Sequence, residues 1–221
     1  MSTASAESSN GSKQPREPAR GLARGQAAAE ASRAKILDGA RAVFLEHGFA
    51  KATMDLVAEV AGVSKQTVYN RFGDKDTLFR DVIGREAERN IGVILETLAG
   101  TVPATEALAR FGEAYIRMRL SPENLALHRV IVGEVARFPE LAREVQAMTS
   151  GRVSRELSAW LSNAAATGRL ALPDEPEFLA DVLMGAWSGA PQQRAVMGAD
   201  GLRRLQPEER ARRVLAMLGI F

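Results

Sequence analysis

Cysteine is absent from this chain of 221 residues, and aromatic residues make up only 5% of it. Without cysteine, a disulfide-stapled secreted scaffold, a thiolate metal site and a thiol nucleophile are excluded. No apolar run in the sequence approaches the roughly 18 residues of a membrane span, and the polar N-terminus lacks the apolar core of a signal peptide. We therefore expect a cytoplasmic protein with no membrane partner.

Histidine is also scarce, which limits the chemistry of the chain. His47 and His128 are the two histidines, and neither has a second histidine at metal-binding spacing. The sequence has no nucleophile elbow, phosphate-binding loop or dinucleotide glycine fingerprint. The carboxylate pairs Glu208/Glu209 and Glu86/Glu88 fit helix starts or solvated faces. We expect no metal, no cofactor and no enzymatic activity.

The formal net charge of +2 hides an uneven distribution. Residues 1–80 hold 12 Lys and Arg against 9 Asp and Glu, whereas residues 81–221 hold 17 against 18. All five lysines lie within the first 75 residues. A mildly basic N-terminal part therefore precedes a nearly neutral body, and the basic part is the place to look for a polyanion partner.

Three regions follow from the spacing of the apolar residues. Residues 1–26 have none of that spacing, which predicts a disordered basic tail that either only solvates the chain or reaches for phosphate. Beyond the tail, apolar residues recur every three or four positions and never alternate as in a strand, so the fold class is all-α. We expect a three-helix domain over residues 27–80 and a helical domain over residues 81–221.

Short helices with strong end signals mark the N-terminal domain. The first helix, residues 26–47, ends at Gly48 as a left-handed cap. Thr53 caps a helix over residues 54–61, and Ser64 caps another over residues 65–72 after a turn at Gly62. Two helices of fewer than ten residues joined by a glycine turn are typical of a helix-turn-helix motif.

The second short helix carries polar residues that suit the reading of DNA. With Val68 and Phe72 inward, its other side chains stay exposed or half-exposed. Gln and Asn pair with adenine, Arg and Lys with guanine, and hydroxyl groups with phosphate. The plainer alternative is a set of ordinary solvated residues. The candidate DNA-binding residues are Lys51, Thr53, Lys65, Gln66, Thr67, Tyr69, Asn70, Arg71 and Lys75.

Further helices are predicted throughout the body. Asp74 caps a long helix over residues 75–98, which joins the two domains, and Ser121 followed by Pro122 starts a later helix. Pro191 must bend or end the helix in which it falls. The remaining helices are predicted over residues 104–120, as one long helix over residues 138–168, from residue 174 onward and over residues 207–218.

Residues 32–78 carry a recognisable order of motifs. The pattern KILDGARAVFLEHGF, the start at Thr53 and the segment AGVSKQTVYNRFGDKDTLF together resemble the TetR family of transcriptional repressors. The resemblance implies base and phosphate contacts for Thr67 and Tyr69, base reading by the residues before them, and a phosphate contact for Lys75. Arg71 stands where His or Tyr is common, and Met54 stands where some members use a reading Arg. These departures leave the operator sequence open.

The segment LHRVIVGEVARFPELAREV looks like the C-terminal domain of AefR-like repressors. This resemblance implies a homodimer on a near-palindromic double-stranded DNA operator, joined through helices near residues 175–190 and 207–218. Small residues on the first of these helices would let two copies approach closely, although packing within one chain is the alternative. The candidate interface residues are Val182, Gly185, Ala186, Gly189, Val214 and Leu218.

The resemblance also implies a small-molecule pocket in the body that would release the repressor from DNA. Methionines and aromatic residues with few inward charges favour an apolar or aromatic effector. The same residues suit a plain core, and a DNA-binding regulator or architectural protein without a small-molecule response is the alternative function. The candidate ligand-binding residues are Phe111, Tyr115, Met118, His128, Met148, Trp160, Met184 and Trp187.

Overall fold

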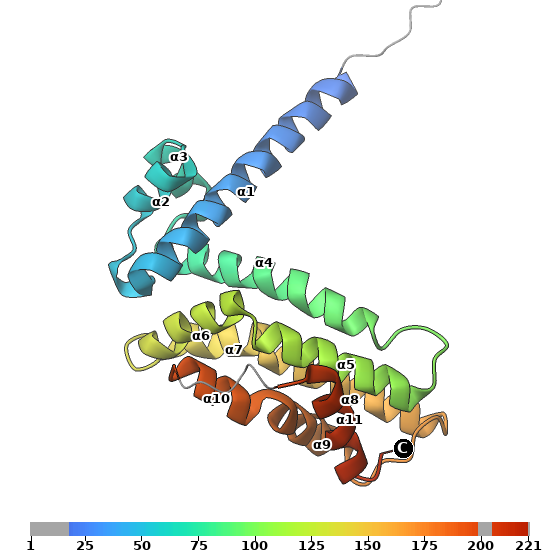
Figure 1. The fold of residues 1–221 in the computed structure, drawn as a ribbon. Coiled ribbons are helices and arrows are strands. Elements are labelled where there is room, and N and C mark those ends of the chain that lie inside the picture. The colour runs from blue at the N-terminus through green and yellow to red at the C-terminus, as the bar shows by residue number, and fades with distance from the viewer. Residues whose placement is uncertain (1–17, 199–204, 221) are drawn as a thin grey trace, which may run out of the picture.

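The computed structural model describes residues 18–198 and 205–220, and this part of the chain contains helices and no strand, which confirms the all-α class. Helices α1–α3 form the N-terminal head, α4 runs between the head and the rest, and the later helices form the body (Figure 1). The helices are α1 (Pro18–Lys51), α2 (Met54–Ala61), α3 (Lys65–Phe72), α4 (Lys75–Glu96), α5 (Ala104–Arg119), α6 (Pro122–Glu134), α7 (Pro139–Met148), α8 (Ser150–Ala166), α9 (Pro176–Met184), η1 (Gly185–Gly189), α10 (Ala190–Val196) and α11 (Pro207–Met217).

The ends of the head helices, apart from the start of α1, lie where the sequence predicts them. The Leu56 N–H donates to the Thr53 hydroxyl at 3.2 Å, and the Thr67 N–H donates to the Ser64 hydroxyl at 3.1 Å. These bonds satisfy donors that the first turn of a helix leaves unpaired. Gly48 interrupts α1 with a φ of 75°, a conformation that glycine adopts without steric cost. The local signals alone therefore decide these boundaries.

Helix α1 starts earlier than predicted. Its first residue is Pro18, so residues 18–26 are helical rather than part of a disordered tail, while residues 1–17 lie outside the described residues. Proline is tolerated in the first turn because its missing N–H would be unpaired there anyway. The alanines that follow favour helix even without an apolar stripe. The N-terminal half of α1 extends away from the other helices (Figure 1).

Two cores are buried, one in the head and one in the body, and α7 of the body packs into the first. In the head, the rings of Phe44 and Phe79 meet edge to face at 5.0 Å between centroids. Leu141 and Val145 of α7 belong to this head core. The ring of Phe138, just before α7, lies 4.9 Å from that of Phe49. The head therefore rests on the body through apolar packing and does not hang from α4 alone.

The single long helix predicted over residues 138–168 is wrong, because the chain breaks at Thr149 between α7 and α8. Thr149 has a non-helical backbone, with φ −108° and ψ −99°, and its hydroxyl donates to the Val145 carbonyl at 2.7 Å. Thr, Ser and Gly at residues 149–151 are poor helix formers. The apolar spacing continues across the break, which is why the pattern hides it.

Pro191 bends its helix, as predicted, through a wide π-helical turn, η1. Proline has no N–H to donate to the carbonyl four residues before it, that of Trp187. The Arg210 guanidinium of α11 donates to this carbonyl at 2.7 Å and also donates to the Ala186 carbonyl. Arg210 thereby joins α11 to the turn. The two carbonyls that it binds would accept N–H groups of the same helix if that helix were regular and had no proline.

Candidate nucleic-acid interface and body cavity

Helix α3 is an eight-residue helix with one anchored side and one open side. Val68 and Phe72 are buried in the head core, as predicted. The candidate reading residues of α3 point outward, since only Thr67 among them is half-buried. The helix thus presents a polar surface on a firm apolar base. The exposed residues are Lys65, Gln66, Tyr69, Asn70 and Arg71.

Hydrogen bonds between neighbouring side chains order this surface. The Gln66 amide donates to the Asn70 side-chain oxygen at 2.6 Å, and the Ser64 and Thr67 hydroxyls lie 2.7 Å apart. Lys65 pairs with Asp55 of α2, and this hydrogen bond raises the pKa of the Lys65 ammonium. Because the pair is exposed to water, its energy is small and a phosphate or a base can take the place of Asp55.

Lys51 and Thr53 lie exposed beside this surface, but Lys75 is directed into the protein. Its ammonium donates to the carbonyls of Phe49 at 2.8 Å, Ala50 at 3.2 Å and Ala52 at 3.1 Å, and it lies 4.6 Å from the centre of the Phe49 ring. An ammonium has three N–H donors, so all are in use. The phosphate contact expected of Lys75 would have to replace bonds that hold the α1–α2 connection against α4.

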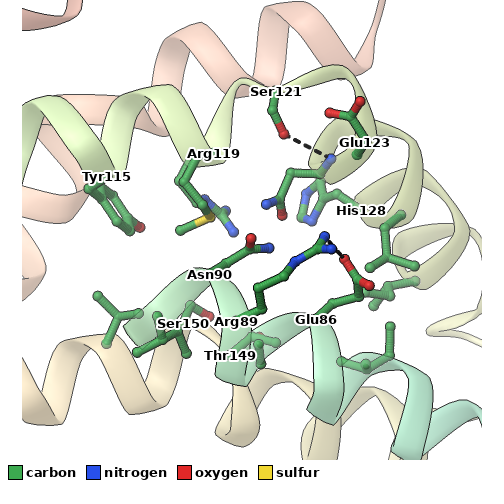
Figure 2. Close-up of a pocket in the computed structure, with 18 of the residues that line it drawn as sticks. Glu86, Arg89, Asn90, Tyr115, Arg119, Ser121, Glu123, His128, Thr149 and Ser150 are labelled. Carbon is green, nitrogen blue, oxygen red and sulfur yellow. Dashed lines mark hydrogen bonds and ion pairs between the residues drawn. The ribbon is translucent and has the colours of Figure 1, made fainter. Parts of the chain in front are cut away.

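The body contains a cavity of about 170 Å³ between α4, α5, α6 and the junction of α7 and α8. Tyr115, Met118 and His128, three of the predicted ligand-binding residues, line it. Figure 2 shows the Arg119, His128 and Asn90 side chains pointing toward one another across this space. Apolar contact is available from Ile91 as well as from Tyr115 and Met118.

The other predicted ligand-binding residues do not line this cavity and pack in or against the two cores. Phe111, Met184 and Trp187 are buried in the body core. The Trp160 indole N–H donates to the Leu98 carbonyl at 3.1 Å, which accounts for its polar atom. Met148 packs against the head core. Helical spacing of methionine and aromatic residues marks a buried face, but it does not separate a core from a cavity wall.

Charged residues line the cavity, so the expectation of few inward charges is wrong. Glu86, read from the sequence as solvated, is 7% exposed. Its carboxylate lies 2.6 Å from Arg89 and 3.7 Å from Arg41. The sequence does indicate that these two residues face inward, since Glu86 and Asn90 follow the spacing of the buried face of α4. Arg119, at the end of α5, likewise follows Tyr115 and Ile116 of the buried face by four and three residues.

Arg119 is the cation without a counter-charge in this cavity. Its guanidinium donates to the Gln192 side-chain oxygen of α10, while its Nε is buried and has no partner. Within residues 18–198 and 205–220, no carboxylate forms an ion pair with it. Burial lowers the pKa of the His128 imidazole, and the Arg119 charge lowers it further. Burial also raises the pKa of the Tyr115 phenol.

Helices α4 and α6 connect the cavity to the head, and Arg41 of the head helix α1 lines the cavity directly. Ile83 and Glu86 of α4 line the cavity, and the N-terminal part of the same helix is buried in the head core. Helix α6 lines the cavity with His128 and ends at Glu134, whose carboxylate accepts a hydrogen bond from the Ala50 N–H of the head at 3.0 Å. A change in the cavity therefore has a direct mechanical path to the head.

The predicted dimer residues divide into a stripe that is at least partly exposed and two residues of the α11 region that pack on the body core. Gly185 and Gly189 are exposed, Val182 and Ala186 are partly exposed, and Phe178 continues the same stripe with 59% exposure. On α11, however, Val214 is buried in the body core and Leu218 packs against it. The exposed apolar residue of α11 is Met217, at 79% exposure. The predicted residues of the first helix are therefore accessible to a second copy, whereas those of α11 pack within the chain.

Two capped short helices, one with an open polar face, joined to a helical body with a cavity, are the architecture of a helix-turn-helix DNA-binding protein with a second helical domain. Residues 36–82 match the model for bacterial regulatory proteins of the tetR family, and residues 106–221 match that for the C-terminal domain of AefR-like transcriptional repressors. The chain belongs to the TetR family of transcriptional repressors, a family of regulators and not of enzymes.

Curated relatives match less than half of the chain. The chain is 33% identical over 96 residues to the transcriptional repressor AcnR of Corynebacterium glutamicum. These residues cover 42% of this chain and 50% of AcnR. The chain is 32% identical over 75 residues to the transcriptional regulator UidR of Escherichia coli, which is 34% of this chain and 38% of UidR. The chain thus matches about half the length of its curated relatives, or less.

Solved structures resemble the chain along most of its length. A TetR-family regulator from Mesorhizobium loti superposes with a TM-score of 0.76 at 24% identity, covering 86% of this chain and 96% of that one. The flavonoid-responsive regulator FrrA superposes with a TM-score of 0.70 at 28% identity, covering 86% and 95%. The head and body together therefore form a known arrangement.

Within the part of the chain that the structure describes, no helix is both long and apolar enough to cross a membrane. The same residues contain no group of three or more His, Asp or Glu side chains placed to hold a metal ion.

Proposed function

We propose that this protein is a homodimeric repressor that binds a near-palindromic operator and leaves it when a small molecule occupies the body cavity. The observation that carries the DNA-binding part is the open polar face of α3 on its buried base of Val68 and Phe72. The ligand-responsive part is supported by the cavity and by the similarity to FrrA, which is described as flavonoid-responsive. Such a protein works where the DNA is, in the cytoplasm.

On DNA, the α3 helices of two copies would enter successive major grooves, with half-sites roughly one helical turn or more apart. Lys65, Gln66 and Asn70 would contact base edges, and the Gln66–Asn70 hydrogen bond supports this by pre-orienting two of them. Thr53, Thr67 and Tyr69 offer hydroxyl groups to bases and phosphates, and Lys51 and Arg71 offer charge. Lys75 supports this surface from below by fixing the α1–α2 connection.

The dimer interface would form around the exposed stripe of α9 and η1 together with the outer face of α11. The glycines of the stripe allow close approach, and Phe178 and Met217 supply apolar area that is now in solvent. A hollow of about 520 Å³ between Ala186 and Met217 could receive side chains of the second copy. Covering these residues removes an apolar patch from water, which is the main driving force for such association.

Release from DNA would follow from a choice between two dimer states. Helices α4 and α6 each contact both the cavity and the head, so a ligand that fits one arrangement of these helices favours one spacing of the two heads. The ligand shifts this equilibrium only by its difference in affinity for the two states. The alternative, a regulator without a small-molecule response, keeps the same DNA surface and leaves the cavity unused.

Selection of bound sequences from random DNA tests the proposal. A recovered palindrome would support the homodimer and would give the spacing of the half-sites. A recovered site without two-fold symmetry would contradict the proposed dimer, and failure to enrich any sequence would contradict the DNA-binding role. With the operator known, a small molecule that lowers operator affinity separates ligand-released repression from the alternative.

A further inference from the structure

The cavity has one cation more than its own residues neutralise. Glu86 already shares its carboxylate between Arg41 and Arg89. The other carboxylate of the lining, Glu123, is exposed in the first turn of α6 and forms no ion pair among the described residues. Arg119 is left with an amide oxygen, that of Gln192, as its only acceptor. A half-buried guanidinium without a carboxylate is only partly compensated, and an anion entering the cavity would pair with it.

The orientation of Arg119 suits an incoming carboxylate. The Gln192 bond holds one terminal nitrogen of the guanidinium and Nε is buried, while the other terminal nitrogen forms no hydrogen bond among the described residues. A guanidinium offers its donors in a planar fork that matches the two oxygens of a carboxylate. Asn90 and His128 point toward the same space (Figure 2) and add donors beside it. These groups can form hydrogen bonds with the oxygens of an anion, whereas a hydrocarbon would leave them without partners.

The rest of the wall is partly apolar and the space is small. Tyr115, Met118 and Val153 line the cavity together with polar side chains such as Ser121 and Asn124. Its volume of about 170 Å³ is similar to that of an engineered apolar cavity of about 150 Å³ that binds benzene. The space therefore suits one ring or a short aliphatic chain, provided that the polar end of the molecule satisfies Arg119.

We propose that the effector cavity binds a small organic acid, with a single ring or a short aliphatic chain, and that Arg119 binds its carboxylate. The inference rests on the proposed function only in treating this cavity as the effector site. It narrows the apolar or aromatic effector expected from the sequence to a molecule with an anionic end.

Calorimetric titration of the full-length protein with matched acids and amides tests the inference. The probes are benzoate, phenylacetate and hexanoate, each compared with benzamide, phenylacetamide and hexanamide. At least one acid should bind saturably and more tightly than its amide by about 10-fold or more, as expected for a charge-assisted hydrogen-bonded pair. Because this comparison uses the unaltered protein, it does not depend on any variant folding.

Arg119→Gln should remove the preference for the acid over the amide. The matched control is Arg117→Gln, two residues earlier on α5, because Arg117 is exposed, pairs with Glu113 and does not line the cavity. The control removes the same charge from the same helix and should keep the preference. Circular dichroism of both variants would show whether each retains its helices.

Three results would overturn the inference: no saturable binding of any of the acids, amides that bind as tightly as acids, or an unchanged preference in folded Arg119→Gln. The outcome for repression is separate. An acid that binds through Arg119 without lowering operator affinity supports this inference and contradicts ligand-released repression. A neutral aromatic compound that releases the operator while the acids do not bind supports release and contradicts the anionic effector.

Discussion

Replacing Lys75 by methionine separates two roles for this residue, a phosphate contact and an internal support. Methionine keeps most of the apolar stem and removes the ammonium. In the structure that ammonium donates to three backbone carbonyls, at 2.8, 3.2 and 3.1 Å, and lies over the Phe49 ring. If the ammonium is an internal support, the substitution removes three intramolecular hydrogen bonds. If the side chain instead reaches DNA, the substitution removes none of them.

The loss of stability can be estimated from these contacts. A hydrogen bond to a charged group contributes about 1.5 to 3 kcal/mol. The three bonds share one ammonium, and Lys75 is only half-buried, so water can replace part of them and the values do not add. We expect Lys75→Met to lower the free energy of unfolding by about 3 kcal/mol. For a chain of this size that corresponds to a fall in Tm of about 6 to 12 °C.

Urea unfolding followed by circular dichroism measures this loss, and operator binding at several salt concentrations measures the other role. A lysine on a phosphate contributes roughly one to the slope of log K against log salt. We expect the slope of Lys75→Met to equal that of the unaltered protein. Lys51→Met is the matched control, because Lys51 is an exposed lysine next to the same connection.

The control should keep its stability and, if Lys51 contacts phosphate, show a slope smaller by roughly one. The reasoning would be refuted by a Lys75→Met variant that keeps its stability within about 0.5 kcal/mol and loses salt dependence instead. That result would place the ammonium on DNA, as the family resemblance implies.

Three further changes have expected outcomes. Tyr69→Ala should weaken operator binding in a gel-shift assay and leave the dimer intact in size-exclusion chromatography, because Tyr69 is 46% exposed; loss of the dimer would contradict its assignment. Gly112→Ala should cost about 1 to 3 kcal/mol in urea unfolding, because the added Cβ would lie 2.6 Å from Cε2 of the fully buried Trp187; an unchanged stability would show that the indole shifts freely. Arg119→Gln should raise the pKa of His128 in an NMR titration, because the Arg119 charge helps to lower it. The pKa of His128 is lower in the folded protein than in the unfolded chain, so the free energy of unfolding decreases as the pH drops through the pKa of the unfolded chain. This decrease in the free energy of unfolding should be smaller in Arg119→Gln.

The head could be predicted from the sequence almost residue by residue. Thr53 and Ser64 start their helices, Gly48 and Gly62 end theirs, and Val68 and Phe72 turn inward, all as expected. These features depend on hydrogen bonds and apolar spacing within a few residues, so the local sequence contains the relevant information. The early start of α1 at Pro18 was missed because alanine-rich helix carries no apolar period.

The body was predicted less well because its decisive contacts join distant segments. The break at Thr149 leaves the apolar period intact, so the spacing of Val145 and Val153 continues across two helices. On α11, packing against α5 and η1 decides that Val214 is buried and Met217 exposed, although both are apolar. A one-dimensional pattern shows that a helix has an apolar face, but not which partner covers it.

The sequence by itself determined the all-α class, the helix-turn-helix and the outward face of α3, because each of these is a property of one short segment. Only the tertiary structure decided where the charges go. It turned the Lys75 ammonium onto the carbonyls before α2, buried Glu86 between two arginines and left Arg119 without a carboxylate. The energy of a charge depends on what surrounds it, and these surroundings come from helices that are far apart in the chain.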